Sequence, residues 1–389
     1  MIAYRFFIFS ISFLYIFFLS PASSLANGIT YNINASFDPL AHTISGKVRI
    51  TSAEPFVSIY IYPNIYAAKD IAISTKESDR IYPRDFNSGY MEILRVADSK
   101  GNDIPFRISG EKNTLLKIED SSPEIVIDFK TKIPEKFGLF GYFKDIYTLA
   151  GGWHPYISLE GSRSNFKITL EMPEDYNIAL SKTLFISSDN LPSPPFTSGE
   201  KGGLKTIHIE ANNISYFDMV ISKKLVETKI EKDEYTFNYY HLKKDKKYAI
   251  SVVDTAFDAA VFFNKNFGKI KNKSVVFAES YLHQDIVSPQ ESLILISNKF
   301  HKAYSYIRRF HDAQLIKGLY YKFWRDIIPK EEEDWVAEGL ADYAMQIYII
   351  DKYKESPSLS GYLKPLAFIP LFDEILYSKK LPMRDIYFK

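Results

Sequence analysis

The sequence predicts two structural parts in one chain, a β-rich part followed by a mixed α/β part. Residues 27–225 contain short runs in which apolar and polar residues alternate, separated by clusters of Asp, Pro, Gly and Asn. This pattern is typical of antiparallel strands with one solvated face. Residues 226–389 instead contain long stretches with helical spacing beside short, continuous apolar runs. We therefore expect an antiparallel β saddle or sandwich over 27–225, and a small sheet with helices over 226–389.

The first 26 residues have the pattern of a secretory signal peptide. Arg5 supplies a basic start, residues 6–19 are almost entirely apolar, and Pro21 precedes the small residues at 24–26. The apolar run is short for a bilayer, so we expect cleavage, with a retained anchor as the alternative. We expect export to a bacterial periplasm or to the exterior, and no integral membrane segment after cleavage.

Composition excludes several classes of function. The 48 Lys and Arg balance the 47 Asp and Glu, which gives no electrostatic argument for binding nucleic acid or an anionic membrane. Because the chain has no cysteine, thiolate metal sites and cysteine nucleophiles are excluded. An exported protein without disulfides must be held by its core, which suits a bacterial periplasm.

The expected elements follow from local patterns. Alternation predicts strands at 30–37, 43–50 and 57–62, where Pro63 ends the third. Helical spacing over 248–263 predicts a helix that ends near Gly268. Five further strands of the first part are expected at 91–96, 114–118, 124–129, 166–171 and 205–210. Two buried strands and two long helices of the second part are expected at 275–278, 293–296, 299–326 and 334–353.

Several segments, taken in order, resemble the M1 family of zinc aminopeptidases. The opening YNINASFDPLAHTISGKVRIT resembles the first hairpin of that family's N-terminal β domain. FGLFG at 137–141, GWHP at 152–155, NFKITLEMP at 165–173 and SYFDMV at 215–220 resemble later parts of the same domain. The resemblance covers most of the chain after residue 26. It implies a thermolysin-like mixed α/β domain over 226–389 that is shorter at its C-terminal end than in the family.

The segment LIKGLYYKFWRDIIPKEEEDWVAEGLADY at 315–343 resembles the metal-binding segment of a gluzincin. In that class an HExxH helix is followed by a Glu within a sequence similar to EGLADY. At the spacing of the family, Glu338 takes the third zinc-ligand position. Leu315 and Leu319 then stand at the two His positions, and Ile316 stands at the position of the general base. Leu and Ile side chains cannot bind zinc or activate water, so the resemblance implies the scaffold without its chemistry.

Two other residues are weaker candidates. Glu291 lies where the resemblance places the strand that binds the substrate's amino terminus, although the Gly-x-Met-Glu-Asn motif is absent. His311 begins a sequence similar to HExxH, but Leu315 occupies the fifth position. An improvised zinc site built from His311 and Glu338 stays open as an alternative.

These observations favour an exported, non-catalytic M1-like protein, a pseudoenzyme that acts as a scaffold or as a peptide- or protein-binding module. No cofactor is expected in that case, and the partner is a protein or peptide rather than nucleic acid. One alternative is a zinc-dependent aminopeptidase whose ligands are atypical or supplied by a partner. Another is a fragment of a split M1 enzyme.

Overall fold

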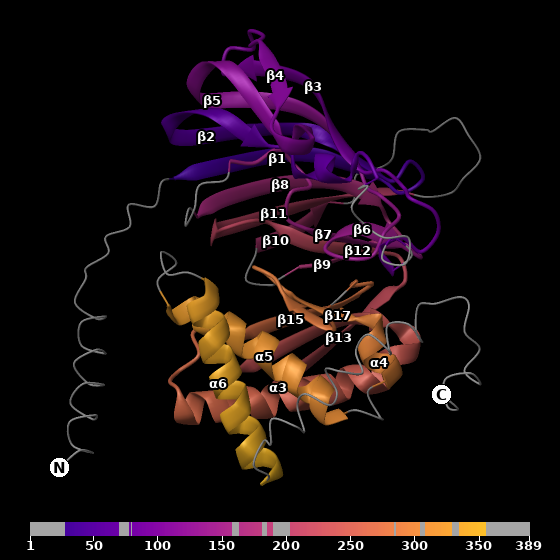
Figure 1. Cartoon of the computed structure of the whole chain (residues 1–389), viewed down its shortest axis with the longest axis vertical. Coiled ribbons are helices and arrows are strands. Elements are labelled where there is room, and N and C mark those ends of the chain that lie inside the picture. Colours follow the sequence, from indigo (N-terminus) through magenta and orange to yellow (C-terminus); the bar gives the residue numbers. More distant parts are fainter. Residues whose placement is uncertain are drawn as a thin grey trace, which may run out of the picture.

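The structure is a computed structural model that describes residues 28–69, 78, 80–157, 163–180, 185–189, 203–283, 285–303, 308–328 and 334–354. The predicted signal peptide lies outside these residues. Figure 1 shows a stack of layers, with a large sheet at one end, a small sheet in the middle, and a third sheet backed by helices at the other end. The predicted order, β-rich first and α/β second, is therefore confirmed.

The large sheet has eight strands in the order β10-β11-β8-β1-β2-β5-β3, with β4 beside β5. Its pairs are antiparallel except for β1 and β8, which run parallel with Ile33 opposite Ile168. The expectation of a purely antiparallel sheet is therefore wrong at this one pair. The strands span Ile29–Asp38 (β1), Thr43–Tyr60 (β2), Tyr90–Asp98 (β3), Phe106–Ser109 (β4), Leu115–Lys132 (β5), Ser164–Pro173 (β8), Phe185–Asp189 (β10) and Leu204–Ile214 (β11).

Two of these strands are longer than their sequences predict. The expected strands at 43–50 and 57–62 belong to one strand, β2, and those at 114–118 and 124–129 belong to one strand, β5. Where β2 pairs with β5, the register shifts on both sides of Phe56. A bulge of this kind absorbs residues that would otherwise end a strand, such as Pro55.

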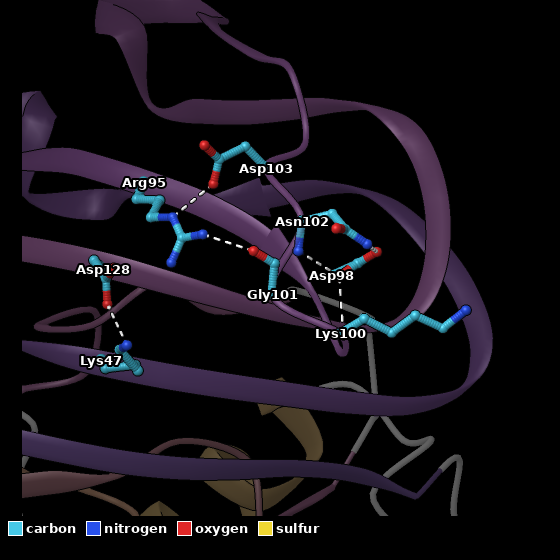
Figure 2. Close-up of polar contacts among 8 residues, drawn as sticks. All are labelled: Lys47, Arg95, Asp98, Lys100, Gly101, Asn102, Asp103 and Asp128. Carbon is cyan, nitrogen blue, oxygen red and sulfur yellow. Dashed lines mark hydrogen bonds and ion pairs between the residues drawn. The ribbon is translucent and has the colours of Figure 1, made fainter.

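The turn between β3 and β4 is closed by polar contacts, as Figure 2 shows. Asp98 Oδ1 accepts hydrogen bonds from the backbone N–H groups of Lys100 (2.9 Å) and Asn102 (2.8 Å). Arg95 Nε lies 2.6 Å from Asp103 Oδ1 across the same turn. The turn is exposed, so this ion pair contributes little to stability beyond fixing the loop.

The middle sheet has four strands in the order β6-β7-β12-β9. Its apolar residues share one core with the large sheet, including Tyr147, Leu149, Phe217 and Met219, and the fully buried Trp153 belongs to that core as well. The first part of the chain is thus a two-layer sandwich. The four strands span Phe140–Phe143 (β6), Ile146–Ala150 (β7), Asn177–Ala179 (β9) and Asp218–Ser222 (β12).

The third sheet has five strands in the order β13-β14-β15-β17-β16. The three inner strands are parallel, and both edge strands are antiparallel to their neighbours. The predicted strands at 275–278 and 293–296 fall on β15 and β17, whereas β13, β14 and β16 were not predicted. The strands span Leu225–Lys232 (β13), Tyr235–Leu242 (β14), Ser274–Ser280 (β15), Val287–Pro289 (β16) and Ile294–Ser297 (β17).

Helices cover only one face of this third sheet. The predictions at 248–263 and 334–353 are confirmed by α3 (Lys246–Asn266) and α6 (Asp334–Tyr353). The expected helix over 299–326 is described as two helices, α4 (Asn298–Ala303) and α5 (Arg308–Ile327). No helix of the described residues is long and apolar enough to cross a membrane.

Two more cores hold the layers together. The helix-side core lies between the third sheet and the helices, and includes Phe237, Phe263, Phe277, Leu319 and Tyr348. The middle core lies on the opposite face of the same sheet, where Tyr240, Val276 and Leu295 pack with Phe137, Ile146 and Val220 of the sandwich part. Burial on both faces explains why these strands are apolar without alternation.

Candidate functional site

Leu315, Ile316 and Leu319, at the positions of the zinc ligands and the general base in the M1 resemblance, lie on α5. All three side chains are fully buried and belong to the helix-side core, together with Phe263 and Tyr320. Burial of each such side chain stabilises a fold by roughly 1.5–3 kcal/mol. These three positions are therefore part of the packing between α3, α5 and the sheet.

Glu338, at the third ligand position, lies on α6 and is exposed. The two helices are joined nearby by an ion pair between Lys317 Nζ and Asp342 Oδ2 at 2.9 Å. The carboxylate of Glu338 thus lies at the surface, whereas Leu315 and Leu319 lie in the core. Among the described residues, no group of three or more His, Asp or Glu side chains is placed to hold a metal ion.

His311 lies on α5, one turn before Leu315, and its ring is buried against Phe300 with 4.6 Å between ring centroids. Burial lowers the pKa of His311 to about 4, so the imidazole is neutral at ordinary pH. His311 therefore lies in the core, whereas Glu338 lies at the surface, and the two do not form the improvised zinc site considered as an alternative.

A buried polar network that sequence patterns did not predict lies near the carboxyl ends of β14 and β15. His301 Nε2 lies 2.7 Å from the hydroxyl of Tyr239 and 3.3 Å from Glu279 Oε1. Burial lowers the pKa of His301 to about 3 and raises the pKa of Glu279, which also shares a hydrogen bond with Asp245. Each shift favours the uncharged form of the group concerned, so His301 and Glu279 are neutral hydrogen-bonding partners inside the fold.

The edge strand β16 lies directly against α5, on the side of the helix that carries Gly318 and Lys322. A Cβ atom at Gly318 would lie 2.9 Å from Val287 Cγ1, so any larger residue would force the Val287 side chain or the strand to shift. One turn further along α5, Lys322 Nζ donates hydrogen bonds to the carbonyl oxygens of Gln290 (3.2 Å) and Glu291 (3.0 Å). Helix α5, which carries Leu315 and Leu319, thus holds the segment that contains Glu291.

Asp218 connects this segment to the sandwich part. From the start of β12, its Oδ1 accepts a hydrogen bond from the backbone N–H of Ser292 at 2.9 Å, and its carbonyl oxygen accepts one from Ser292 Oγ at 3.3 Å. Asp218 Oδ2 has no hydrogen-bond partner among the described residues. Complete burial raises the pKa of Asp218 to about 6, although the charge of Lys322 opposes the shift.

Glu291 completes this group of charges. Burial raises its pKa, and the positive charges of Lys322 and Arg163 act in the opposite direction. Arg163 is itself fixed by a hydrogen bond from Nη1 to the carbonyl oxygen of Asn213 at 2.6 Å. We name Asp218, Glu291, Lys322 and Arg163 the junction cluster, because it lies where α5, β16 and β12 meet.

The junction cluster contains acids and bases but no metal ligand set and no activated nucleophile among its four members. Its hydrogen bonds fix the segment that follows β16, and its Asp218 carboxyl is fully buried. Of the four members of the junction cluster, only Glu291 was predicted from the sequence as a candidate site residue. Asp218 carried a detectable signal, a single acid inside the apolar run FDMV, whereas Lys322 and Arg163 carried none.

Comparison with known proteins gives no relative of this chain among the family models and the curated sequences. The M1 resemblance therefore depends on the motifs and their spacing in the sequence alone.

Proposed function

We propose that this chain is an exported M1-like protein that lacks catalytic zinc and acts as a scaffold or as a peptide- or protein-binding module. The observation that carries the proposal is the burial of Leu315, Ile316 and Leu319 in an apolar core. Two His and a Glu buried there without metal would cost several kcal/mol in unmatched polarity, whereas aliphatic side chains stabilise the helix.

The layout of the chain supports the proposal. A β sandwich precedes a sheet with parallel inner strands, and α5, which carries the degenerate motif, contacts the antiparallel edge strand β16. The resemblance places an amine-binding strand in the same position, just before β17. Glu291 lies two residues after the end of β16, so the residue proposed for ligand contact is close to this strand.

The edge strand also suggests how a peptide would bind. In the described part of the third sheet, β16 pairs with β17 on one side and has no strand on the other. An extended peptide can add to such an edge through main-chain hydrogen bonds, and side groups beside the edge then give specificity. Of the two acids of the junction cluster beside β16, Asp218 is fully buried and Glu291 is half-buried, so we assign contact with a positive group of the ligand to Glu291.

A peptidase assay separates this proposal from the zinc-enzyme alternative. The purified protein, supplied with zinc, is expected to release no more amino acid from aminoacyl and peptide substrates than a blank. A chelator and the Glu338→Ala substitution should leave this baseline unchanged. Asp351→Ala, at another exposed acid of α6, serves as the matched control.

The peptidase assay also has an outcome that contradicts the proposal. Hydrolysis that is abolished both by the chelator and by Glu338→Ala, but not by Asp351→Ala, would show that Glu338 is a metal ligand. The proposal of a non-catalytic protein would then be wrong, and the two missing ligands would have to be sought on a partner or in the residues outside the described ranges.

A further inference from the structure

The outward face of α6 exposes apolar side chains in a line. Trp335 is 66% exposed, Tyr343 is 56% exposed and Ile350 is 38% exposed. With about 100° of rotation per residue, positions 335, 343 and 350 lie within roughly 80° of one another around the helix axis. We name these three residues the α6 stripe. It lies opposite the face that packs on α5 through Ala341, Met345 and Tyr348.

The residues between the members of the stripe are uncharged as well. Gly339 and Gln346 fall on the same face and are exposed. A helix that packs on a core with one face normally carries charged residues on the other. Acids lie only at one margin of the stripe, where Asp342 is paired with Lys317 and Glu338 is exposed. An exposed Trp and Tyr on the uncharged part of this face indicate a surface that is covered by another segment or molecule.

Helix α6 ends with a residue in the left-handed conformation. Lys354 has φ +53°, and its N–H donates to the carbonyl oxygen of Ile350 at 2.9 Å. This is the left-handed termination that commonly ends a helix, and it is often accompanied by an apolar contact between the following residues and the last turn. The next residue, Glu355, begins a segment that lies outside the described residues.

The composition of that segment matches an apolar surface. Residues 355–389 contain two concentrations of large apolar side chains, at 362–372 and at 375–377. About ten residues of extended chain span the roughly 30 Å length of a 20-residue helix, so the segment is long enough to cover the stripe. Its apolar residues are Leu359, Tyr362, Leu363, Leu366, Ala367, Phe368, Ile369, Leu371, Phe372, Ile375, Leu376, Tyr377, Leu381, Met383, Ile386, Tyr387 and Phe388.

We propose that the α6 stripe is the docking surface for residues 355–389 of the same chain. A second copy of the protein is the competing occupant, but three apolar residues on one helix fall short of the roughly 800 Å² per partner that a stable interface buries. The C-terminal segment needs less contact area, because its attachment to Lys354 gives it a high effective concentration. This inference is independent of the proposed function.

Photo-crosslinking in the full chain after signal cleavage tests the proposal. A benzophenone amino acid is placed at position 335 in one protein and at position 351 in another. Asp351 is exposed, lies on a different side of α6 and is closer in sequence to the segment. We expect position 335 to give adducts with peptides from 355–389 at monomer mass, with several-fold lower yield from position 351.

Three outcomes would overturn the proposal. Equal yields at positions 335 and 351 would mean that the segment meets the helix only through its attachment. Adducts at the mass of a dimer would assign the stripe to a second copy. The absence of any protein adduct from position 335 would leave the stripe in contact with solvent.

A second variant tests the same contact without a crosslinker. Tyr343→Ser combined with Ile350→Ser alters exposed side chains only, so the helix is expected to remain folded. Loss of their apolar contacts should increase tryptic cleavage after Lys379, Lys380 and Arg384 by about tenfold or more. Asp351→Ser should leave the cleavage rate unchanged. An unchanged rate in the double variant would contradict docking on the stripe.

Discussion

Replacing Leu319 by alanine is expected to lower the free energy of unfolding by about 2–5 kcal/mol, the range found for large-to-small changes in cores. The side chain is 0% exposed and lies in the helix-side core with Phe263, Tyr320 and Tyr348. Alanine would leave a cavity between α5 and its neighbours, because the surrounding side chains of this core can fill the space only by shifting. Urea unfolding followed by circular dichroism measures the change.

Leu94→Ala is the matched control, since Leu94 is 58% exposed on β3. The control should change the free energy of unfolding by less than about 0.5 kcal/mol. If Leu319→Ala were equally neutral, the position would belong to an open cleft. The idea that aliphatic packing has replaced a metal site would then lose its main support.

Replacing Asp218 by asparagine is expected to make the stability of the protein less dependent on pH. Burial raises the pKa of Asp218 from 3.8 to about 6 in the folded state. Between these values the unfolded chain releases a proton that the folded chain retains, so wild-type stability falls as the pH rises through this window. A difference of about 2 pKa units corresponds to about 3 kcal/mol.

The asparagine variant lacks this proton equilibrium, and its side-chain oxygen can still accept the hydrogen bond from Ser292 N. The stability of the variant relative to wild type should therefore rise by up to about 3 kcal/mol between pH 4 and pH 6 and stay level above it. Denaturant unfolding at a series of pH values measures the difference. Asp103→Asn, at an exposed position of the β3–β4 turn, is the control.

A difference between Asp218→Asn and wild type that does not change with pH would contradict the account. It would mean that the Asp218 carboxyl is solvated in the folded protein, and that the contact between β12 and Ser292 is open to water. The junction cluster would then be a surface feature rather than part of the buried contact between the two parts of the chain.

Local patterns were sufficient to predict those elements whose burial follows a simple period. Strand β1 alternates almost perfectly between buried and exposed residues, and α6 begins and ends where the apolar spacing predicts. The breaks expected inside β2 and β5 were wrong, because pairing between the two strands carries both of them through an irregular register at Phe56. Such pairing is a tertiary effect that the sequence of one strand does not contain.

The junction cluster was largely invisible to sequence patterns for the same reason. Asp218 and Ser292 are 74 positions apart, and the two residues meet only because the sandwich packs on the third sheet. Lys322 is one of many lysines, and its role depends on the approach of β16 at Gly318. Leu315 and Leu319 were singled out only through the spacing to Glu338 that the M1 resemblance implies, and that assignment stays a prediction.

Zinc content tests the central claim most directly. The protein from Asn27 onward is purified in folded form, incubated with zinc, freed of excess metal and examined by mass spectrometry for bound metal. If the protein is non-catalytic and M1-like, we expect far less than one equivalent of bound zinc per chain, and no change in zinc content on Glu338→Ala. One full equivalent of bound zinc that is lost on Glu338→Ala would contradict the account. It would show that the protein has a zinc site that includes Glu338 and ligands other than those assigned here.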